Sequence, residues 1–598
     1  MTYHAPLNDM LFVMKELAGL EAVNALPGCE EAGMETVEAV LQENARFCTE
    51  VIAPLNWSAD QQPGSWRDGH VTTAAGFKEA FKAFGDAGWQ GVQHPGEFGG
   101  QGLPKLVATP CIEMLNSANL SFALCPLLTD GAIEALMTAG SEAQKTLYLP
   151  NLVSGKWTGT MNLTEPQAGS DLAMVRTRAV PQNDGTGTYK LYGTKIYITY
   201  GEHDMAENIV HLVLARVSGA PDGVKGLSLF VVPKFLADAD GTIGTRNDVY
   251  CLSIEHKLGI KASPTAVLQF GDHGGAVGTL VGMENRGLEY MFIMMNAARF
   301  AVGMQGIGIA QRSYQQAVDF ARLRVQSRDP AGSAGPVAII EHPDVRRMLM
   351  SMRAQIEAAR ALAYVTAAAF DTSHHAQDDE TRTASKNFYE YMVPIVKGWS
   401  TEMSIDVASQ GVQVHGGMGF IEETGAAQYY RDARILTIYE GTTAIQANDL
   451  IGRKTMRDGG SAARHIIDQA RSTQTELASR SNADLQSIGK LLGTGLDALE
   501  QVVAYVVANT QADARSVFAG SVPYLRLAGV VLGGWQMGRA ASAAERLLAT
   551  ATGDADFYRA KIVTARFFAD HILVQADAYR RAILFGSESV LVMSKSQF

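Results

Sequence analysis

The residue best suited by its sequence context to acid–base chemistry is a glutamate directly before a Gly-Thr pair. Glu440 follows the apolar residues Ile438 and Tyr439 and precedes Gly441 and Thr442. A carboxylate kept out of water has a raised pKa, so it can accept a proton that a solvated glutamate would leave in place. The pattern therefore predicts a general base at Glu440. The alternative is a glutamate that caps a helix beginning at Gly441 and Thr442.

Three further polar strings precede Glu440 in the chain. Residues 161–171 read MNLTEPQAGSD, residues 193–199 read GTKIYIT, and residues 413–420 read QVHGGMGF. Glycine has no Cβ, so the pair in the last string allows a backbone to approach a ligand closely. Each string alone also fits an ordinary turn, strand or helix end. In this order and at these separations, the four strings resemble those of the acyl-CoA dehydrogenase flavoprotein family.

The resemblance covers about residues 34–453. The N-terminal appendage and the helical tail are similar to the larger subgroup of the family. Within it, the strings at 340–347 and 438–442 look most like the 3-(methylthio)propionyl-CoA dehydrogenase group and its bacterial fatty-acyl-CoA relatives. The resemblance implies an FAD-dependent enzyme that converts an acyl-CoA thioester to the trans-2-enoyl-CoA and passes electrons to an electron-transfer flavoprotein.

The resemblance also implies the roles of particular residues. Glu440 would take the proton next to the thioester carbonyl, and its own backbone N–H would polarise that carbonyl. The implied FAD contacts are Met161, Leu163, Thr164, Ser170, Tyr197, Ile198, Thr199, Arg324, Gln413, Gly416, Gly417 and Thr442. The implied substrate contacts are Ser170, Arg299, Tyr439 and Gly441.

Some positions depart from the family pattern. Tyr197 stands where the family commonly has a tryptophan against the flavin. Ala444 stands where a glutamine often contacts the adenosine side, so that contact is expected to be missing or replaced. Asn296, beside Arg299, replaces an acid found in many relatives.

Arg324 matches a position that reaches a flavin phosphate in a neighbouring subunit. The resemblance therefore implies a homo-oligomer. A dimer is favoured, because the C-terminal tail is expected to cover the surface that smaller relatives use to form tetramers.

Composition restricts the class of protein. The chain has 598 residues, 47% hydrophobic and 19% charged, as in a globular protein. The net charge of −12 argues against nucleic acid as a partner. Residues 460–598 hold 14 Lys+Arg and 12 Asp+Glu, so their net charge is 14 − 12 = +2 and gives no basic stripe. No apolar run reaches the ~18 residues of a membrane span, and we expect no signal peptide.

The five cysteines lack CxxC spacing. We therefore expect reduced thiols, no metal site and a cytoplasmic protein.

The pattern of apolar residues changes twice along the chain. Short β-branched and aromatic segments bounded by Gly, Pro, Asn or Asp predict strands at 157–163, 189–199, 209–217, 227–232 and 266–270. Helical periodicity precedes and follows them, most clearly at 314–322, 346–370 and 386–409, and at moderate strength over 10–20. The predicted fold is mostly α with an inserted β-domain.

We divide the chain into an N-terminal appendage (1–33), a helical domain (34–155), a β-barrel-like domain (156–284), a four-helix bundle carrying the base (285–457) and a helical extension (458–598).

Two other functions remain open at this point. An acyl-CoA oxidase would use the same base and give its electrons to oxygen. A non-catalytic flavoprotein could bind nucleic acid or a protein, although the intact Glu440 and the nearly neutral tail argue against it. The length of the acyl chain depends on the depth of the pocket, which the sequence does not give.

Overall fold

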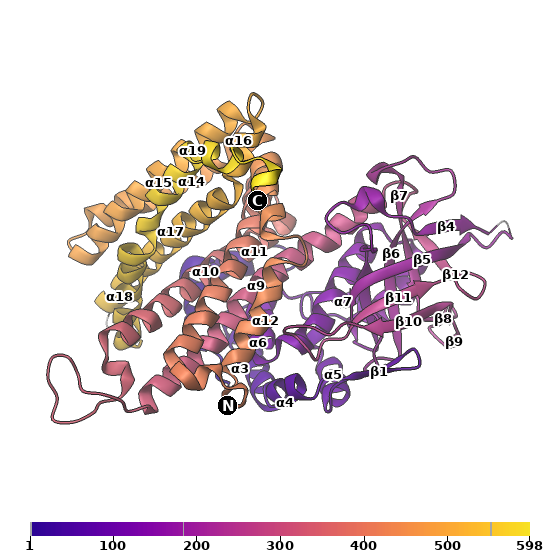
Figure 1. The fold of residues 1–598 in the computed structure, drawn as a ribbon, viewed down its shortest axis with the longest axis horizontal. Helices are drawn as coiled ribbons and strands as arrows, with labels where there is room; N and C mark the ends of the chain where they lie inside the picture. The colour runs from indigo at the N-terminus through magenta and orange to yellow at the C-terminus, as the bar shows by residue number, and fades with distance from the viewer. Residues whose placement is uncertain (1–2, 183, 551–552) are drawn as a thin grey trace.

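The computed structural model describes residues 3–182, 184–550 and 553–598. Helices occupy both ends of the chain and strands occupy a central stretch. Figure 1 shows the strands gathered at one end of the molecule, the long helices beside them, and the last helices of the chain on the far side. The predicted fold class, mostly helical with an inserted β-domain, is confirmed.

Helices precede the β-domain, some with one buried face and others buried on most sides. In one of them, the side chains of Phe77, Ala80, Phe81 and Phe84 are buried at the three- and four-residue spacing read from the sequence. The hairpin of β1 and β2 was not predicted, because all but one of its side chains are exposed. The elements are α3 (Met34–Phe47), η2 (Cys48–Ile52), α4 (Leu55–Gln61), β1 (Ser65–Arg67), β2 (His70–Thr72), α5 (Phe77–Asp86), α6 (Lys105–Ala118), α7 (Leu120–Ala139) and α8 (Glu142–Val153).

The β-domain contains a closed ring of strands. β4 pairs with both β5 and β6, and the order β5–β12–β7–β6 links those two on the other side. β11 and β10 extend the sheet from β5, and β3 lies parallel to β6. The strands are β3 (Trp157–Asn162), β4 (Arg178–Pro181), β5 (Thr188–Thr199), β6 (Asn208–Val217), β7 (Leu227–Pro233), β8 (Phe235–Ala237), β9 (Ile243–Arg246), β10 (Val249–Ile254), β11 (Thr265–Phe270) and β12 (Ala276–Val281).

All five strands predicted from the sequence are present, with ends within one residue of those expected. Strands β4, β8, β9, β10 and β12 were not predicted. Most of them are three or four residues long or expose alternate side chains at an edge, so they lack the continuous apolar character of the buried strands.

Three long helices form the centre of the molecule: α9 (Gly287–Leu323), α10 (Pro343–His375) and α11 (Asp379–His415). Each contains a predicted helix and is longer than predicted. α9 and α11 approach closely at two glycines. A Cβ at Gly303 would lie 2.9 Å from the carbonyl oxygen of Val396, and one at Gly306 would lie 2.6 Å from that of Ser400. Any side chain at those positions would force the helices apart.

The segment that carries Glu440 follows α11. It consists of α12 (Ala426–Ala433), the 3₁₀ turn η10 (Arg434–Thr437), an irregular stretch, α13 (Thr443–Asp449) and the π-turn η11 (Leu450–Met456). The irregular stretch lies between two short helices that pack on α11, so it is held at both ends.

In the part of this stretch that the structure describes, seven α-helices follow: α14 (Ser461–Ser479), α15 (Ala483–Asn509), α16 (Ala514–Ala519), α17 (Ser521–Ala549), α18 (Ala555–His571), α19 (Ala576–Phe585) and α20 (Ser587–Leu591). α17 packs on α10, α11 and α13. The ring of Trp399 on α11 lies against Gly529 and Gly533, where a Cβ would come within 2.3 and 2.8 Å of it. The C-terminal helices therefore support the outer face of α11.

The N-terminal segment packs between these groups of helices. It contains α1 (Leu7–Phe12), the π-turn η1 (Val13–Leu17) and α2 (Leu20–Asn24). The single helix predicted over 10–20 is wrong at its end, because Gly19 adopts a φ of +69° and separates η1 from α2.

Asp9 joins the N-terminal segment to two other parts of the chain. One oxygen of its carboxylate lies 2.5 Å from Lys561 of α18, and the other lies 2.6 Å from Arg360 of α10. Burial opposes ionisation of Asp9, but the two cations outweigh it and lower its pKa to about 2.

Within the described residues, three helices are long and apolar enough to cross a membrane by length and composition: α7, α9 and α15. In this structure, 83%, 67% and 50% of their most apolar 18-residue windows are buried inside the protein. The sequence contains no unbroken apolar run of that length, so these windows were not recognised as candidates.

We expect Asp9→Ala to lower the free energy of unfolding by about 1.5–3 kcal/mol, because it removes charge-assisted hydrogen bonds while the two cations keep their other partners, Glu113 and Glu357. Thermal unfolding at pH 7 measures the effect. The stabilisation requires the ionised carboxylate, so it should be present above about pH 4 and be lost as the pH falls towards 2. The exposed pair of Asp379 and Arg382 supplies a control, and Asp379→Ala should cost less than about 1 kcal/mol. Equal shifts for the two variants would contradict this role of Asp9.

Candidate active site

Glu440 lies in the irregular stretch between η10 and α13 with a φ of +53°. This left-handed conformation is unfavourable for a residue with a side chain and costs on the order of 1–3 kcal/mol. Its side chain is half-buried. Among the described residues, its carboxylate accepts no hydrogen bond and its backbone N–H has no acceptor. Both groups therefore remain available to a ligand.

Electrostatics bring the pKa of Glu440 close to neutrality. Burial raises it to about 7, while Lys397 of α11 and Arg299 of α9 oppose that rise. An unperturbed glutamate has a pKa of about 4.3. A pKa near 7 suits a general base, because a substantial fraction is ionised at neutral pH and the carboxylate still has a high proton affinity.

Lys397 is fully buried beneath this stretch. Its Nζ donates to the carbonyl oxygen of Leu436 at 2.8 Å and to that of Gly441 at 2.7 Å. The two acceptors stand on either side of Glu440 in the chain, so one side chain holds both ends of the strained turn.

Arg299 was expected to face the coenzyme A moiety. In the structure its side chain is buried, and its Nη1 lies 3.3 Å from Asp449 of α13. Asp449 also pairs with Arg453 at 2.8 Å. Arg299 therefore contributes positive charge near Glu440, and its contact with substrate remains a prediction.

The alternative of Glu440 as a helix cap is wrong. Thr442 is the N-cap of α13, and its hydroxyl accepts a hydrogen bond from the N–H of Ile445 at 3.2 Å. Gly441 precedes it with a φ of +85°, a conformation that glycine tolerates. Tyr439, on the other side of Glu440, donates its hydroxyl to Gln305 of α9.

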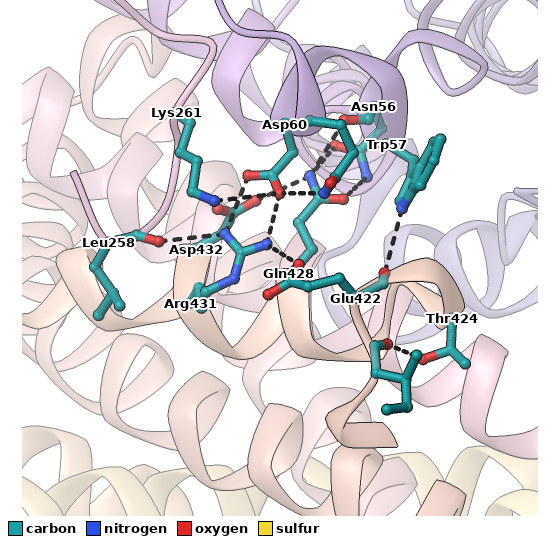
Figure 2. Close-up of polar contacts among 12 residues, drawn as sticks. Asn56, Trp57, Asp60, Leu258, Lys261, Glu422, Thr424, Gln428, Arg431 and Asp432 are labelled. Carbon is teal, nitrogen blue, oxygen red and sulfur yellow. Dashed lines mark hydrogen bonds and ion pairs between the residues drawn. The ribbon is translucent and has the colours of Figure 1, made fainter. Parts of the chain in front are cut away.

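A polar network fastens α12, which leads towards Glu440, to two other parts of the chain. Arg431 contacts Asp60 of α4 at 2.5 Å and also the carbonyl oxygen of Leu258 in the β-domain (Figure 2). Its neighbour Asp432 accepts a hydrogen bond from the N–H of Ile260 at 2.5 Å. The start of the base-carrying segment is thus tied both to the N-terminal helices and to the β-domain.

The predicted flavin segments meet where β3 ends and β5 bends. Lys195 of β5 and Glu165, which follows β3, form a buried ion pair at 2.8 Å. Glu165 also accepts hydrogen bonds from the backbone N–H groups of Arg176 and Thr177. Burial opposes ionisation, but Lys195 and these hydrogen bonds lower the pKa of Glu165 to about 2. The ion pair therefore pins the loop from 163 to 177 onto β5.

Tyr197 occupies a β-bulge in β5. The register with β11 shifts between Ala266 and Leu268, and Tyr197 has a φ of +60°. A bulge redirects side chains that strict alternation would place elsewhere. As a result, the ring of Tyr197 is 61% exposed while Ile198 is buried.

The remaining predicted contacts of this region are arranged around these residues. Met161 is buried, Leu163, Thr164 and Thr199 are half-buried, and Ser170 is exposed on the loop. An exposed aromatic ring beside half-buried hydroxyl groups fits one end of a flavin. These residues could hold FAD, and their individual contacts remain predictions.

A second group of predicted FAD contacts lies at the far end of α9 and α11. The ring of His415 lies 4.5 Å from that of Phe320, so the C-terminal ends of the two helices are neighbours. Arg324 and Gln413 are exposed there, and Gly416 has a φ of +59°. A Cβ at Gly416 or at Gly417 would meet no atom within 4 Å, so this surface is open to a ligand. Exposed apolar side chains surround it: Leu323, Val325, Met418, Phe420 and Ile421.

The second group lies far along α9 from Arg299, which is near Glu440. Arg299 and Arg324 are separated by 25 residues along α9, or about 37 Å at 1.5 Å per residue. The sequence strings did not show this separation, because it depends on the lengths and parallel arrangement of α9 and α11.

Sequence reasoning missed several residues around Glu440. Lys397, Gln305 and Asp449 were not proposed, although all three lie on helices that contact the turn. A signal existed for Lys397, the one charged residue in the apolar stretch from Tyr391 to Trp399. The five cysteines are buried thiols, and no cluster of potential metal ligands occurs within the described ranges.

Four family models match the chain. The N-terminal, middle and C-terminal domains of acyl-CoA dehydrogenases match residues 34–156, 160–273 and 285–455. A model described as acetyl-CoA dehydrogenase C-terminal like matches residues 465–594. Together they cover most of the sequence.

Curated relatives match over the full length. The chain is 52% identical to a 3-methylmercaptopropionyl-CoA dehydrogenase of Ruegeria pomeroyi, over 99% of this chain and 100% of the relative. It is 35% identical to a broad-specificity linear acyl-CoA dehydrogenase of Mycobacterium tuberculosis, over 100% of both chains. Among solved structures, an acyl-CoA dehydrogenase complexed with FAD from Bacillus anthracis superposes with a TM-score of 0.76 at 22% identity, over 95% of this chain and 91% of that one.

We expect Lys195→Met to lower the free energy of unfolding by about 3–5 kcal/mol, because it leaves the buried Glu165 carboxylate without its cation. Release of bound flavin on dilution should become faster, since the loop from 163 to 177 loses its anchor. Adding Glu165→Gln removes the unpaired charge and should restore part of the stability. As a control, Lys82→Met breaks only the exposed pair with Asp86. If Lys195→Met and Lys82→Met melt at the same temperature, the ion pair does not hold this loop.

Proposed function

The chain belongs to the acyl-CoA dehydrogenase family and is an FAD-dependent enzyme; on that premise we propose that it oxidises 3-methylmercaptopropionyl-CoA or a straight-chain fatty acyl-CoA, with Glu440 as the base. The product is the corresponding trans-2-enoyl-CoA. The observation that carries the proposal is that one residue combines a half-buried carboxylate and a backbone N–H, neither of which has a hydrogen-bond partner among the described residues.

The two groups of Glu440 have complementary tasks in this reaction. Its N–H donates to the thioester carbonyl oxygen, where negative charge develops as the neighbouring carbon loses its proton. Its carboxylate accepts that proton. FAD, when bound, supplies the acceptor for the hydride that leaves the next carbon. Thr164, Tyr197 and Thr199 would hold the reactive end of the cofactor, and the buried surroundings of Glu440 limit the access of water.

The choice of substrate is based on the activities of similar proteins. The Ruegeria pomeroyi relative, at 52% identity, is a 3-methylmercaptopropionyl-CoA dehydrogenase, while the relative at 35% identity acts broadly on linear acyl-CoA. We propose 3-methylmercaptopropionyl-CoA or a similar thioester ahead of longer chains. Comparing the rates of anaerobic flavin bleaching across a panel of acyl-CoA thioesters ranks these substrates.

We further propose that two subunits share each FAD. One chain supplies the residues near Tyr197, and its partner supplies Arg324, Gln413, Gly416 and Gly417. Arg324 lies about 37 Å along α9 from Arg299, the arginine near Glu440, and this distance supports the division. The exposed apolar side chains around Arg324, including Leu323 and Phe420, also favour a contact between copies there. A homodimer is the smallest assembly that completes both sites.

We propose an electron-transfer flavoprotein as the electron acceptor and the cytoplasm as the location. An oxidase would use the same base, so Glu440 does not distinguish the two activities. Measuring oxygen consumption by the reduced protein without an added acceptor does: slow consumption supports the dehydrogenase, and rapid consumption would identify an oxidase.

We expect Glu440→Gln to retain the fold and FAD but to reduce flavin at least 10²–10⁴-fold more slowly, roughly the contribution of a general base. The amide preserves the backbone N–H and accepts no proton at neutral pH. The assay is anaerobic mixing with a thioester that bleaches the wild type. Glu423→Gln, at an exposed position in the same domain, is the matched control and should be unaffected. Flavin reduction within a few-fold of wild type in the Glu440 variant would rule out this base.

We expect Arg324→Ala to weaken FAD retention and subunit association together, because the residue is assigned to the cofactor of the partner subunit. Light scattering combined with flavin absorbance measures both quantities. Arg347→Ala, which removes another exposed arginine of the bundle, is the control. A monomeric wild type with full FAD occupancy would contradict the shared site.

A further inference from the structure

We propose that Lys397 is a positioning residue for Glu440: it fixes the turn that carries the carboxylate and stabilises its ionised form. The inference rests on the proposed role of Glu440 as the base. It goes beyond that role by assigning a function to a buried lysine on a different helix.

Hydrogen bonds from Lys397 hold the turn around Glu440 in an unfavourable conformation. Glu440 adopts a φ of +53°, which a residue with a side chain keeps only when its surroundings enforce it. Lys397 donates to the carbonyl oxygens of Leu436 and Gly441, which bracket that residue. Gln446 adds donations to the carbonyl oxygens of Glu440 and Gly441, both at 3.2 Å. The peptide groups of the turn are therefore held from α11 on one side and from α13 on the other.

Lys397 and Glu440 also affect each other's ionisation. A buried ammonium group is costly unless hydrogen-bonded or near an anion. Burial lowers the pKa of Lys397 to about 7, and the Glu440 carboxylate is the main group that opposes this change. In return, Lys397 is the main cation that opposes the raised pKa of Glu440. Each group therefore stabilises the charged form of the other.

The other charges near Glu440 are largely engaged elsewhere. Arg299 of α9 faces it but pairs with Asp449 of α13, which also pairs with Arg453. Glu402 of α11 lies near Lys397 and pairs with Arg526 of α17 at 2.9 Å.

By contrast, Lys397 forms no ion pair within 4.0 Å in the described part of the chain. Of the cations near Glu440, Lys397 is therefore the one whose charge is least neutralised by another residue.

The position of Lys397 is set by the close contact of two helices. On α11 it lies between Val396 and Ser400, the residues whose carbonyl oxygens approach Gly303 and Gly306 of α9. Trp399, two residues further on, is held against α17. Lys397 is therefore mounted on a stretch of helix packed on both sides.

The test is the pH dependence of substrate-driven flavin reduction in Lys397→Met. Glu440 must be ionised to accept a proton, so the wild-type rate should rise with pH through about 7. Removing the main cation that acts on Glu440 should raise the pKa of this carboxyl group by about 1–3 units. The rising limb of the pH–rate profile should move to higher pH by that amount. The rate at pH 7 should fall by at least about fivefold and recover as the pH is raised.

Lys397→Gln is a second variant that removes the charge but keeps a hydrogen-bond donor, in case Lys397→Met does not fold. It should show the same upward shift with FAD content unchanged. Lys454→Met is the control, because this lysine pairs with Glu390 and is not among the charges acting on Glu440. Its limb should match that of the wild type.

Two outcomes would overturn the proposal. One is a folded Lys397 variant whose pH–rate profile rises within about 0.3 pH units of the wild-type profile. The other is a variant whose rate falls by the same factor at every pH. Glu440→Gln separates this failure from failure of the proposed function. If that variant reduces flavin rapidly, Glu440 is not the base and both proposals fall. If it does not, an unshifted limb counts against Lys397 alone.

Discussion

Desolvation of a single carboxylate is the constraint on which the site depends. Glu440 has to be dry enough for its pKa to approach 7, yet ionised often enough to accept a proton. An isolated buried carboxylate would simply remain protonated. Lys397 and Arg299 provide the opposing field, and the same lysine anchors the backbone that presents the carboxylate. Electrostatics and backbone geometry are thus coupled through one buried side chain.

The rest of the fold brings these groups together. Glycines at 303 and 306 allow α9 and α11 to approach closely, and the C-terminal helices brace α11 from its other side. The network around Arg431 connects the β-domain to α12. Within the β-domain, the ion pair of Lys195 and Glu165 holds the loop from 163 to 177 against β5. Each link joins segments far apart in sequence, so the site depends on long-range contacts as well as on the residues next to Glu440.

The sequence predicted the order of helices and strands well, because buried strands and amphipathic helices carry strong periodic signals. It singled out Glu440 as a candidate base through the apolar residues before it, the Gly-Thr pair after it and the family resemblance of the other three strings. It did not predict the positive φ of Tyr197 or of Glu440, since neither is a residue that favours that conformation. The role inferred for Lys397 could not be predicted either, because the two carbonyl oxygens that accept its hydrogen bonds lie about 40 residues further along the chain.

The most direct measurement is infrared difference spectroscopy between the wild type and Glu440→Gln across pH 5 to 9. The absorption of a protonated carboxyl group that disappears in the variant belongs to Glu440. We expect this band to titrate with a midpoint near 7 in the wild type. A band that is already nearly absent at pH 6, as for an ordinary glutamate with a pKa of about 4.3, would show that the carboxylate is solvated. The claim that burial prepares it as a base would then be contradicted.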